Sequence, residues 1–169
     1  RSSDLPTLAL AQAKTKAKAR AKKQAAERPE PTVANYKYGD DSPRQVFDFW
    51  QAKSDKPTPL LLMIHGGGWV NGDRIGYAAL GIQLARTGDY AAVGVGYRLS
   101  KEASWPAQVH DCKAAIRWLR ENAGTYNIDP ARIGVWGSSA GGHLVALLGT
   151  SAGVMDAEGT VGGNLDQSS

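Results

Sequence analysis

Apolar residues along this chain form short continuous runs, separated by longer segments in which they recur at helical spacing. Residues 60–64 (LLLMI) follow two prolines and predict a strand that is buried on both faces. Residues 90–97 and 133–136 are two further apolar runs of strand length. We expect the first to be a central strand and the second to be a buried parallel strand.

The segments between these runs have the spacing of helices. Residues 75–86 place apolar side chains on or near one side, and Gly88 follows as a stop signal. A clearer helix starts at residues 105–106 (Trp-Pro) and is expected to end at Gly124. Its apolar stripe consists of Val109, Cys112, Ile116, Leu119 and Ala123. Strands that alternate with helices at these lengths predict an α/β fold, with a mostly parallel sheet covered by helices on both faces.

Two β-like segments, residues 33–39 and 44–52, precede this alternation. The turn residues at 40–43 (DDSP) lie between them, so we expect a β-hairpin. The chain has a single cysteine, Cys112, which excludes an internal disulfide framework. Because Cys112 lies on the apolar helical stripe, we expect a core residue and not a nucleophile.

The net charge of +4 comes from one segment. Residues 12–28 hold seven Lys or Arg and one Glu, and the rest of the chain holds 13 basic and 15 acidic residues, a net of −2. The cations of this segment fall on every side of a helical wheel, and its apolar residues are all alanine. A solvated spacer is therefore favoured over a nucleic-acid-binding arm, because no aromatic residues are interleaved.

These changes in composition predict three regions. Residues 1–11 are either the end of a signal peptide, which would make the protein secreted or periplasmic, or an unstructured terminus. Residues 12–32 form the basic linker, with Pro-Glu-Pro at 29–31 as the domain boundary, and residues 33–169 form the folded domain. No run of eighteen apolar residues occurs, so no membrane-spanning helix is implied.

The candidate chemistry begins directly after the run at 133–136. Residues 137–141 read GSSAG, a G-x-S-x-G motif that is followed by an apolar segment long enough for a short helix. Between a strand and a helix, this motif predicts a nucleophile elbow, a strained turn that exposes the hydroxyl of Ser139. A Cβ at Gly137 or Gly141 would clash with the neighbouring strand or helix. The backbone N–H after Ser139 lies at the helix N-terminus, free to face a developing oxyanion.

A second glycine motif follows the run at 60–64. Residues 65–69 read HGGGW, and three consecutive glycines after a buried strand let the backbone approach a ligand and point N–H groups into a cleft. Acyl transfer needs such donors around its tetrahedral intermediate, where one is worth about 10²–10³ in rate. The alternative is a glycine-rich turn with a capping histidine, which is disfavoured by the pairing with the elbow in this order.

With both motifs in place, the sequence resembles an α/β-hydrolase of the lipase/esterase type with an HGGGW oxyanion loop. It is most similar in pattern to the small secreted carbohydrate and feruloyl esterases that neighbour the hormone-sensitive-lipase family. The resemblance covers about residues 33–169. The matching segments are HGGGWVNGDR (65–74), GYRLS (96–100), WPAQVHDCKAAIRWLR (105–120) and NIDPARIGVWGSSAGGHLVALL (127–148).

The resemblance implies a role for each matching residue. Ser139 would be the nucleophile, and His65 would brace the glycine loop without acting as the catalytic base. No metal or organic cofactor is implied. The oxyanion donors would be the N–H groups of Gly67, Gly68 and Ala140. The supporting residues would be His65, Gly66, Trp69, Gly137 and Gly141.

The chain departs from the family pattern after the nucleophile. In this fold the triad acid and then the histidine follow the serine, but His143 is the only histidine after Ser139, and it precedes every acid of that segment. His143 belongs to the helix of the elbow, and His110 is expected to pair structurally with Asp111. The sequence therefore predicts the N-terminal part of a hydrolase domain that lacks the last strands and the triad acid and base. We expect almost no esterase activity from this chain alone.

The favoured function is a serine hydrolase that cleaves carboxylic esters through an acyl-enzyme. The expected partner is a small-molecule or polysaccharide ester, such as acetyl or feruloyl groups on a polysaccharide, and not a nucleic acid. A peptidase or amidase of the same fold is one alternative. A non-catalytic hydrolase-like binding module is another, disfavoured because Ser139 is present. Trp69, Tyr77 and Trp105 either line the substrate pocket or belong to the core.

Overall fold

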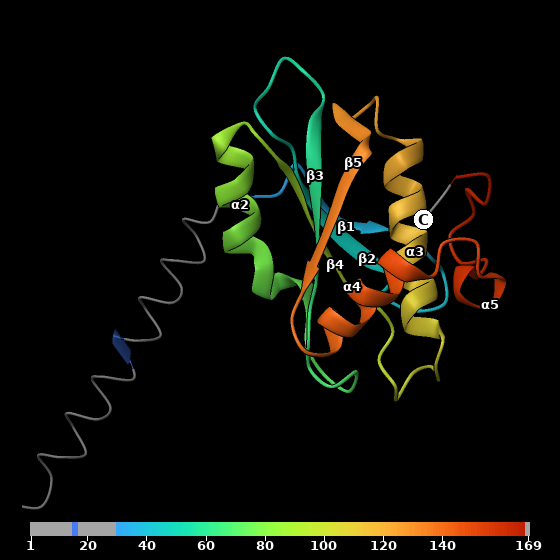
Figure 1. Cartoon of the computed structure of the whole chain (residues 1–169). Helices are drawn as coiled ribbons and strands as arrows, with labels where there is room; N and C mark the ends of the chain where they lie inside the picture. Colours follow the sequence, from blue (N-terminus) through green and yellow to red (C-terminus); the bar gives the residue numbers. More distant parts are fainter. Residues whose placement is uncertain (1–14, 17–29, 168–169) are drawn as a thin grey trace, which may run out of the picture. The chain divides into compact units, whose positions relative to one another are not determined.

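The computed structural model describes residues 15–16 and 30–167. The chain divides into two units, Arg1–Glu30 and Pro31–Ser169, and the second contains the fold described here (Figure 1). Residues 1–11 and most of residues 12–32 lie outside the described part. The proposed signal-peptide end, the basic spacer and the three-region organisation therefore stay predictions.

Five strands form a single mixed sheet in the order β1-β2-β4-β3-β5. The strands are β1 (Val33–Lys37), β2 (Val46–Trp50), β3 (Thr58–Ile64), β4 (Ala91–Val95) and β5 (Ile128–Gly137). β1 and β2 form the predicted antiparallel hairpin, and β2 is also antiparallel to β4. β4, β3 and β5 are parallel to one another, which confirms the predicted α/β fold.

Helices cover both faces of this sheet (Figure 1). α2 (Ala78–Thr87) follows the 3₁₀ turn η1 (Arg74–Tyr77) and packs on one face, whereas α3 (Ala107–Glu121) and α4 (Ala140–Thr150) pack on the other. Each face of the sheet has its own hydrophobic core, and successive side chains of β3 point alternately into one core and the other. Leu62 lies in the α3/α4 core and Met63 in the smaller α2 core.

α3 carries the larger core and also anchors the C-terminal segment, which includes α5 (Met155–Glu158). Cys112 is fully buried on α3, and burial raises the pKa of its thiol, so it is a core residue as predicted. Lys113 donates to the Ser151 carbonyl at 3.2 Å, and Arg117 donates to the Val161 carbonyl at 2.8 Å. Two buried cations of the helix therefore hold backbone that follows α4.

Helix boundaries differ from the sequence expectation at two ends. The helix expected at 75–86 begins as η1, and α2 then ends before Gly88, which adopts φ 80° as predicted. The expectation that Gly124 ends the next helix was wrong, because α3 ends at Glu121. The side chain of Asn122 bonds back to the Trp118 carbonyl at 2.9 Å, which terminates the helix earlier.

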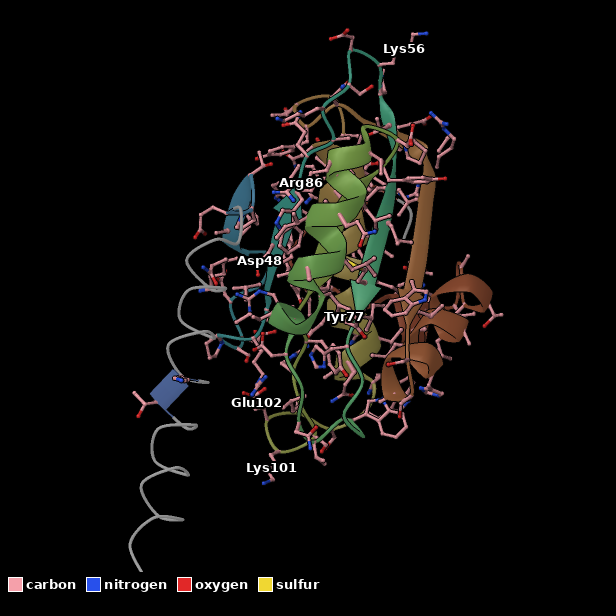
Figure 2. The ribbon with its side chains drawn as sticks, turned by 90° about the vertical axis from the view of Figure 1, so that its left-hand side faces the viewer. Asp48, Lys56, Tyr77, Arg86, Lys101 and Glu102 are labelled. Carbon is pink, nitrogen blue, oxygen red and sulfur yellow. The ribbon has the colours of Figure 1, made fainter. Side chains whose placement is uncertain are left out.

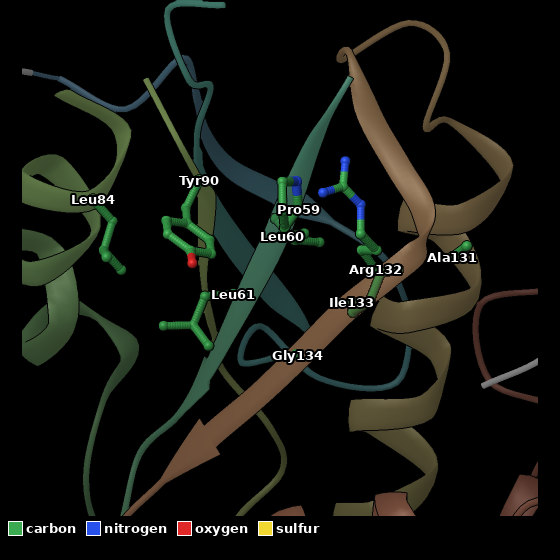
Figure 3. Close-up of a pocket in the computed structure, with 9 residues that line it drawn as sticks. All are labelled: Pro59, Leu60, Leu61, Leu84, Tyr90, Ala131, Arg132, Ile133 and Gly134. Carbon is green, nitrogen blue, oxygen red and sulfur yellow. The ribbon is translucent and has the colours of Figure 1, made fainter. Parts of the chain in front are cut away.

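β5 is less buried than its apolar sequence suggested. Within the described residues it pairs with β3 alone, and Trp136 is 43% exposed. The expectation of a buried parallel strand at 133–136 is thus confirmed for the parallel pairing and wrong for the burial, because burial of a strand depends on neighbours that its own sequence does not contain. A hollow of about 410 Å³ lies beside β5, between Leu61, Leu84, Tyr90 and Ile133 (Figure 3).

Candidate active site

The two glycine motifs meet at one edge of the sheet. In the parallel register, Ile64 at the end of β3 is paired with Val95 of β4 and with Gly137 of β5. The segments that follow these three strands therefore start at the same level and on the same side. This edge, at the carboxyl ends of parallel strands, is where α/β folds usually bind ligands.

The elbow holds Ser139 in a strained conformation. Its φ of 53° and ψ of −122° lie outside the regions that residues with a side chain normally adopt. Ser139 is exposed and is the N-cap of α4. The N–H of Gly141 donates to the Ser138 carbonyl at 2.9 Å, and this bond helps to start the helix. The turn thus presents a hydroxyl directly at a helix N-terminus.

The elbow glycines are required by space. A Cβ on Gly141 would lie 2.1 Å from the Ile64 carbonyl oxygen and 2.8 Å from that of His65. A Cβ on Gly137 would lie 2.7 Å from the same Ile64 oxygen. The clash that the motif predicts is therefore present. It shows that the elbow packs against the carbonyl groups of Ile64, which ends β3, and of His65, which follows it.

The glycine turn, residues 65–72, reaches the elbow directly. A Cβ on Gly66 would lie 2.7 Å from the Ser138 carbonyl oxygen and 3.4 Å from the Cβ of Ser139. Gly67 adopts φ 117° and Gly68 adopts φ 60°, which are conformations that glycine favours. The backbone of the glycine turn thus lies directly beside the elbow, with no room for a side chain at Gly66.

Three backbone N–H groups of the two loops have no hydrogen-bond acceptor among the described residues. The N–H groups of Gly67, Gly68 and Ala140 donate to no acceptor within residues 30–167. Ala140 is the first residue of α4, so the partial positive charge of a helix N-terminus adds to its N–H. Such an arrangement is suited to stabilise negative charge that develops on an oxygen next to Ser139.

His65 lies inside the glycine turn. It is only 4% exposed, and its Nδ1 donates to the Gly66 carbonyl at 2.8 Å. Its ring is stacked on Tyr97, with centroids 4.2 Å apart. Burial lowers the pKa of His65, so the imidazole is neutral near pH 7. This position fits the brace that the family resemblance implies.

The expected pairing of His110 with Asp111 does not form, because the two side chains have different partners. Nε2 of His110 lies 2.8 Å from the Asp156 carbonyl oxygen. Asp111 is fully buried, and its carboxylate accepts from Arg98 at 2.7 Å and from Gln45 at 2.8 Å. Asp111 thereby holds the segment after β4 against α3, while His110 holds the segment after α4.

A cavity of about 330 Å³ adjoins the glycine turn. Its lining residues are Gly68, Trp69, Ser100, Trp105, Gln108 and His143. The exposed His143 ring lies close to two indoles, with its centroid 5.4 Å from that of Trp69 and 5.8 Å from that of Trp105. Trp105 is 55% exposed. Trp69 and Trp105 therefore line a cavity beside the elbow and are not simply core residues.

Two tyrosines beside this site make contacts that the sequence did not predict. Tyr77, the third aromatic considered for the pocket, instead packs edge-on against Trp136 and donates to the Ile64 carbonyl at 3.2 Å. Tyr97 belongs to the matching segment GYRLS, to which the resemblance assigns no role, and follows β4 by two residues. Its position next to the site depends on the strand order, which the sequence does not reveal.

The described residues contain neither a metal-binding cluster nor a membrane-spanning helix. Across residues 15–16 and 30–167, no group of three or more His, Cys, Asp or Glu side chains is arranged to hold a metal ion. No helix in the same residues is long and apolar enough to cross a membrane.

Comparison with known proteins points to esterases. The BD-FAE family model matches residues 48–169. Esterase LipC of Mycobacterium tuberculosis is 43% identical over 119 residues, which cover 68% of this chain and 29% of LipC. Carboxylesterase NlhH of the same organism is 36% identical over 108 residues, covering 64% of this chain and 33% of NlhH. The chain thus matches about a third or less of these relatives' length.

Solved structures agree with this result. A truncated form of a carbohydrate esterase from gut microbiota superposes with a TM-score of 0.75 at 34% identity, covering 85% of this chain and 55% of that protein. A bifunctional GH43-CE protein of Bacteroides eggerthii gives a TM-score of 0.72 at 33% identity, covering 79% of this chain and 19% of the larger protein.

Proposed function

This chain belongs to the BD-FAE family of α/β-hydrolases, and we propose that it forms the nucleophile-bearing part of a carboxylic ester hydrolase. The observation that carries the proposal is the contact of the glycine turn with the elbow, where Gly66 approaches the Cβ of Ser139. We infer from this contact that the strained, exposed serine and the backbone donors of the glycine turn act on the same substrate group. Relatives that are named esterases support the same activity.

In the proposed reaction, Oγ of Ser139 attacks the ester carbonyl carbon, and the serine proton passes to a general base. The electron pair of the C=O bond moves onto oxygen, which accepts hydrogen bonds from the N–H groups of Gly67, Gly68 and Ala140. Collapse of this intermediate expels the alcohol, which takes the proton from the base. Water then cleaves the acyl-serine by the same steps in reverse.

The general base of this proposal lies outside the 169 residues. His65 is buried in the glycine turn, His110 contacts the Asp156 carbonyl, and His143 lies close to two indoles. None of these histidine rings is hydrogen-bonded to the Ser139 hydroxyl within the described residues, and the longer relatives extend well beyond the matched segment. We expect the base and its carboxylate partner to come from such additional chain.

The proposed substrate is an acetyl or feruloyl ester of a polysaccharide. The cavity beside Gly68 offers the rings of Trp69 and Trp105, and indole faces suit the planar or weakly polar faces of phenolic and sugar rings. Structural neighbours that are described as carbohydrate esterases support this class of substrate.

The test supplies the missing base from solution. The 169-residue chain is incubated with p-nitrophenyl acetate and increasing imidazole, and the acetylated protein is digested with trypsin. Arg132 is the last basic cleavage site of the chain, so the elbow is released in a lysine-free peptide, residues 133–169. Acetylation of that peptide is measured by mass spectrometry in the wild type, in Ser139→Ala and in the matched variant Ser138→Ala.

We expect imidazole-dependent acetylation in the wild type and in Ser138→Ala, and at least about tenfold less in Ser139→Ala. Without imidazole, the label and the turnover should both be small, because the serine hydroxyl is not activated. Equal labelling of Ser139→Ala and the wild type would refute Ser139 as the nucleophile. Rapid turnover without imidazole would refute the external base.

A further inference from the structure

We propose that Tyr97, assisted by Tyr77, is a positioning residue that sets the oxyanion turn against the nucleophile by holding the carbonyl groups of Ile64, the last residue of β3, and of His65, which follows it. This inference rests on the proposed function of the glycine turn. It assigns a task to two tyrosines that belong neither to the elbow nor to the HGGGW motif. Neither tyrosine is expected to touch substrate.

Tyr97 makes two contacts with the start of the turn. Its hydroxyl donates to the His65 carbonyl oxygen at 2.8 Å, and its ring stacks on the His65 imidazole at an interplanar angle of 12°. Tyr97 is fully buried, and burial raises the pKa of its hydroxyl, which therefore remains a donor at every pH used to assay the chain. His65 is thus fixed through its carbonyl group and its ring together.

Tyr77 holds the preceding carbonyl group from a different element. It is the last residue of η1, and its hydroxyl donates to the Ile64 carbonyl oxygen at 3.2 Å, near the end of β3 (Figure 2). This contact is longer than that of Tyr97, and Tyr77 is only half-buried. We therefore expect Tyr77 to contribute less than Tyr97.

The elbow lies against the same two carbonyl groups. The α-carbon of Gly141 is so near that an added Cβ would be 2.1 Å from the Ile64 oxygen and 2.8 Å from the His65 oxygen. The carbonyl groups of Ile64 and His65 are therefore contacted by the tyrosine hydroxyls and also lie next to Gly141 of the elbow. Because the peptide planes of Ile64 and His65 lead directly into the glycines, their orientation sets the direction of the N–H groups that follow.

Small displacements matter at such a site. Misplacing a catalytic group by about 1 Å can reduce the rate by about 10²-fold, and removing a hydroxyl leaves a buried carbonyl without its partner. A purely structural tyrosine would lower stability without altering the turn. Tyr38 provides a control of the same chemistry, because it is also buried and donates to a backbone carbonyl, that of Gly96 at 2.6 Å, which follows β4 and does not lead into the glycine turn.

The first measurement needs no activity. Backbone ¹⁵N order parameters of Gly67 and Gly68 are compared in the 169-residue wild type, Tyr97→Phe, Tyr77→Phe and Tyr38→Phe. Rigid backbone gives values near about 0.85 and flexible backbone values below about 0.6. We expect Tyr97→Phe to lower both glycine values toward the flexible range, Tyr77→Phe to lower them less and Tyr38→Phe to leave them unchanged. Phe retains the ring in each variant, and thermal unfolding verifies that each is folded.

The second measurement is the imidazole-dependent acetylation of residues 133–169. We expect Tyr97→Phe to lower the maximal acetylation rate about tenfold while the ester concentration at half-maximal rate stays unchanged. If Tyr97→Phe and Tyr38→Phe lose similar stability and neither changes the order parameters of the turn, the positioning role is overturned. If the wild type is not acetylated at Ser139, the proposed function fails, and the order parameters still decide whether the tyrosines hold the turn.

Discussion

The elbow and the glycine turn both depend on glycine, but for different physical reasons. Gly137 and Gly141 of the elbow sit where an added Cβ would meet backbone within 2.1 to 2.7 Å. Gly67 and Gly68 of the turn have φ values of 117° and 60°, so the backbone conformation selects glycine at both, and at Gly67 an added Cβ would also lie 2.1 Å from the Asn71 carbonyl oxygen. In the elbow, the unfavourable backbone conformation is instead carried by Ser139 itself.

The conformation of the elbow thus depends on close packing, whereas that of the glycine turn depends on contacts that position it. The elbow is built by close approach to β3, and the strain at Ser139 persists because the surrounding contacts determine it. The glycines of the turn can adopt many backbone conformations. Contacts from outside the turn, such as those of Tyr97 with His65, are therefore needed to fix its orientation. Substitutions at the glycines can test the two reasons separately.

The largest effect is expected from Gly141→Ala. The new Cβ would lie 2.1 Å from a backbone oxygen that cannot move without disturbing β3, so the substitution should cost about 3 kcal/mol of the free energy of unfolding. Gly149→Ala is the matched control in α4, because nothing lies within 4 Å of its added Cβ. It should stabilise the chain by about 0.5–1 kcal/mol. Urea unfolding of both variants measures the difference, and equal midpoints would contradict the close approach.

Gly67→Ala and Gly68→Ala should differ within the turn. At Gly67 the added Cβ would lie 2.1 Å from the Asn71 carbonyl oxygen at a φ of 117°, whereas at Gly68 the nearest atom is 3.9 Å away at a φ of 60°. We expect Gly68→Ala to cost only about 1–2 kcal/mol, the usual penalty of the left-handed conformation, and Gly67→Ala to cost more. The unfolding midpoints give the ranking, and a larger loss at Gly68 would argue against this geometry.

The smallest effect concerns the brace of the turn. Burial lowers the pKa of His65 in the folded chain, so the unfolded chain binds a proton first as the pH falls through about 6.5. The contribution of His65 to stability is therefore complete above that pH and declines as the pH falls from there toward the folded-state pKa. His65→Gln should make the unfolding free energy less dependent on pH between about 7.5 and 5. An identical slope in both chains would show that His65 does not remain neutral.

Local patterns in the sequence predicted much of this site. The apolar run before HGGGW and the apolar segments around GSSAG identified β3, β5 and α4, because each pattern is a property of consecutive residues. The turn conformation of Gly67 and the need for glycine at position 141 follow from the same local chemistry. The two motifs could be expected to meet because parallel strands place their carboxyl ends at one edge.

The remaining features depend on which elements become neighbours. Trp136 looked like part of a buried strand but is 43% exposed, because β5 has β3 as its one partner among the described strands. Tyr97 reaches His65 because β4 lies next to β3, and Asp111 pairs with Arg98 instead of the adjacent His110 for a similar reason. Contacts over such sequence separations leave no periodic or motif signal.

The most direct test of the account is whether the two loops act on the same ligand atom. Phenylboronic acid forms a tetrahedral adduct with an active serine, and this adduct resembles the intermediate of ester cleavage. In a titration of the ¹⁵N-labelled 169-residue chain with imidazole present as the base, the amide resonances of Gly67, Gly68 and Ala140 should shift together with one dissociation constant. Ser139→Ala should abolish these shifts. Shifts confined to one loop, or retained in Ser139→Ala, would contradict the convergence of the glycine turn and the elbow.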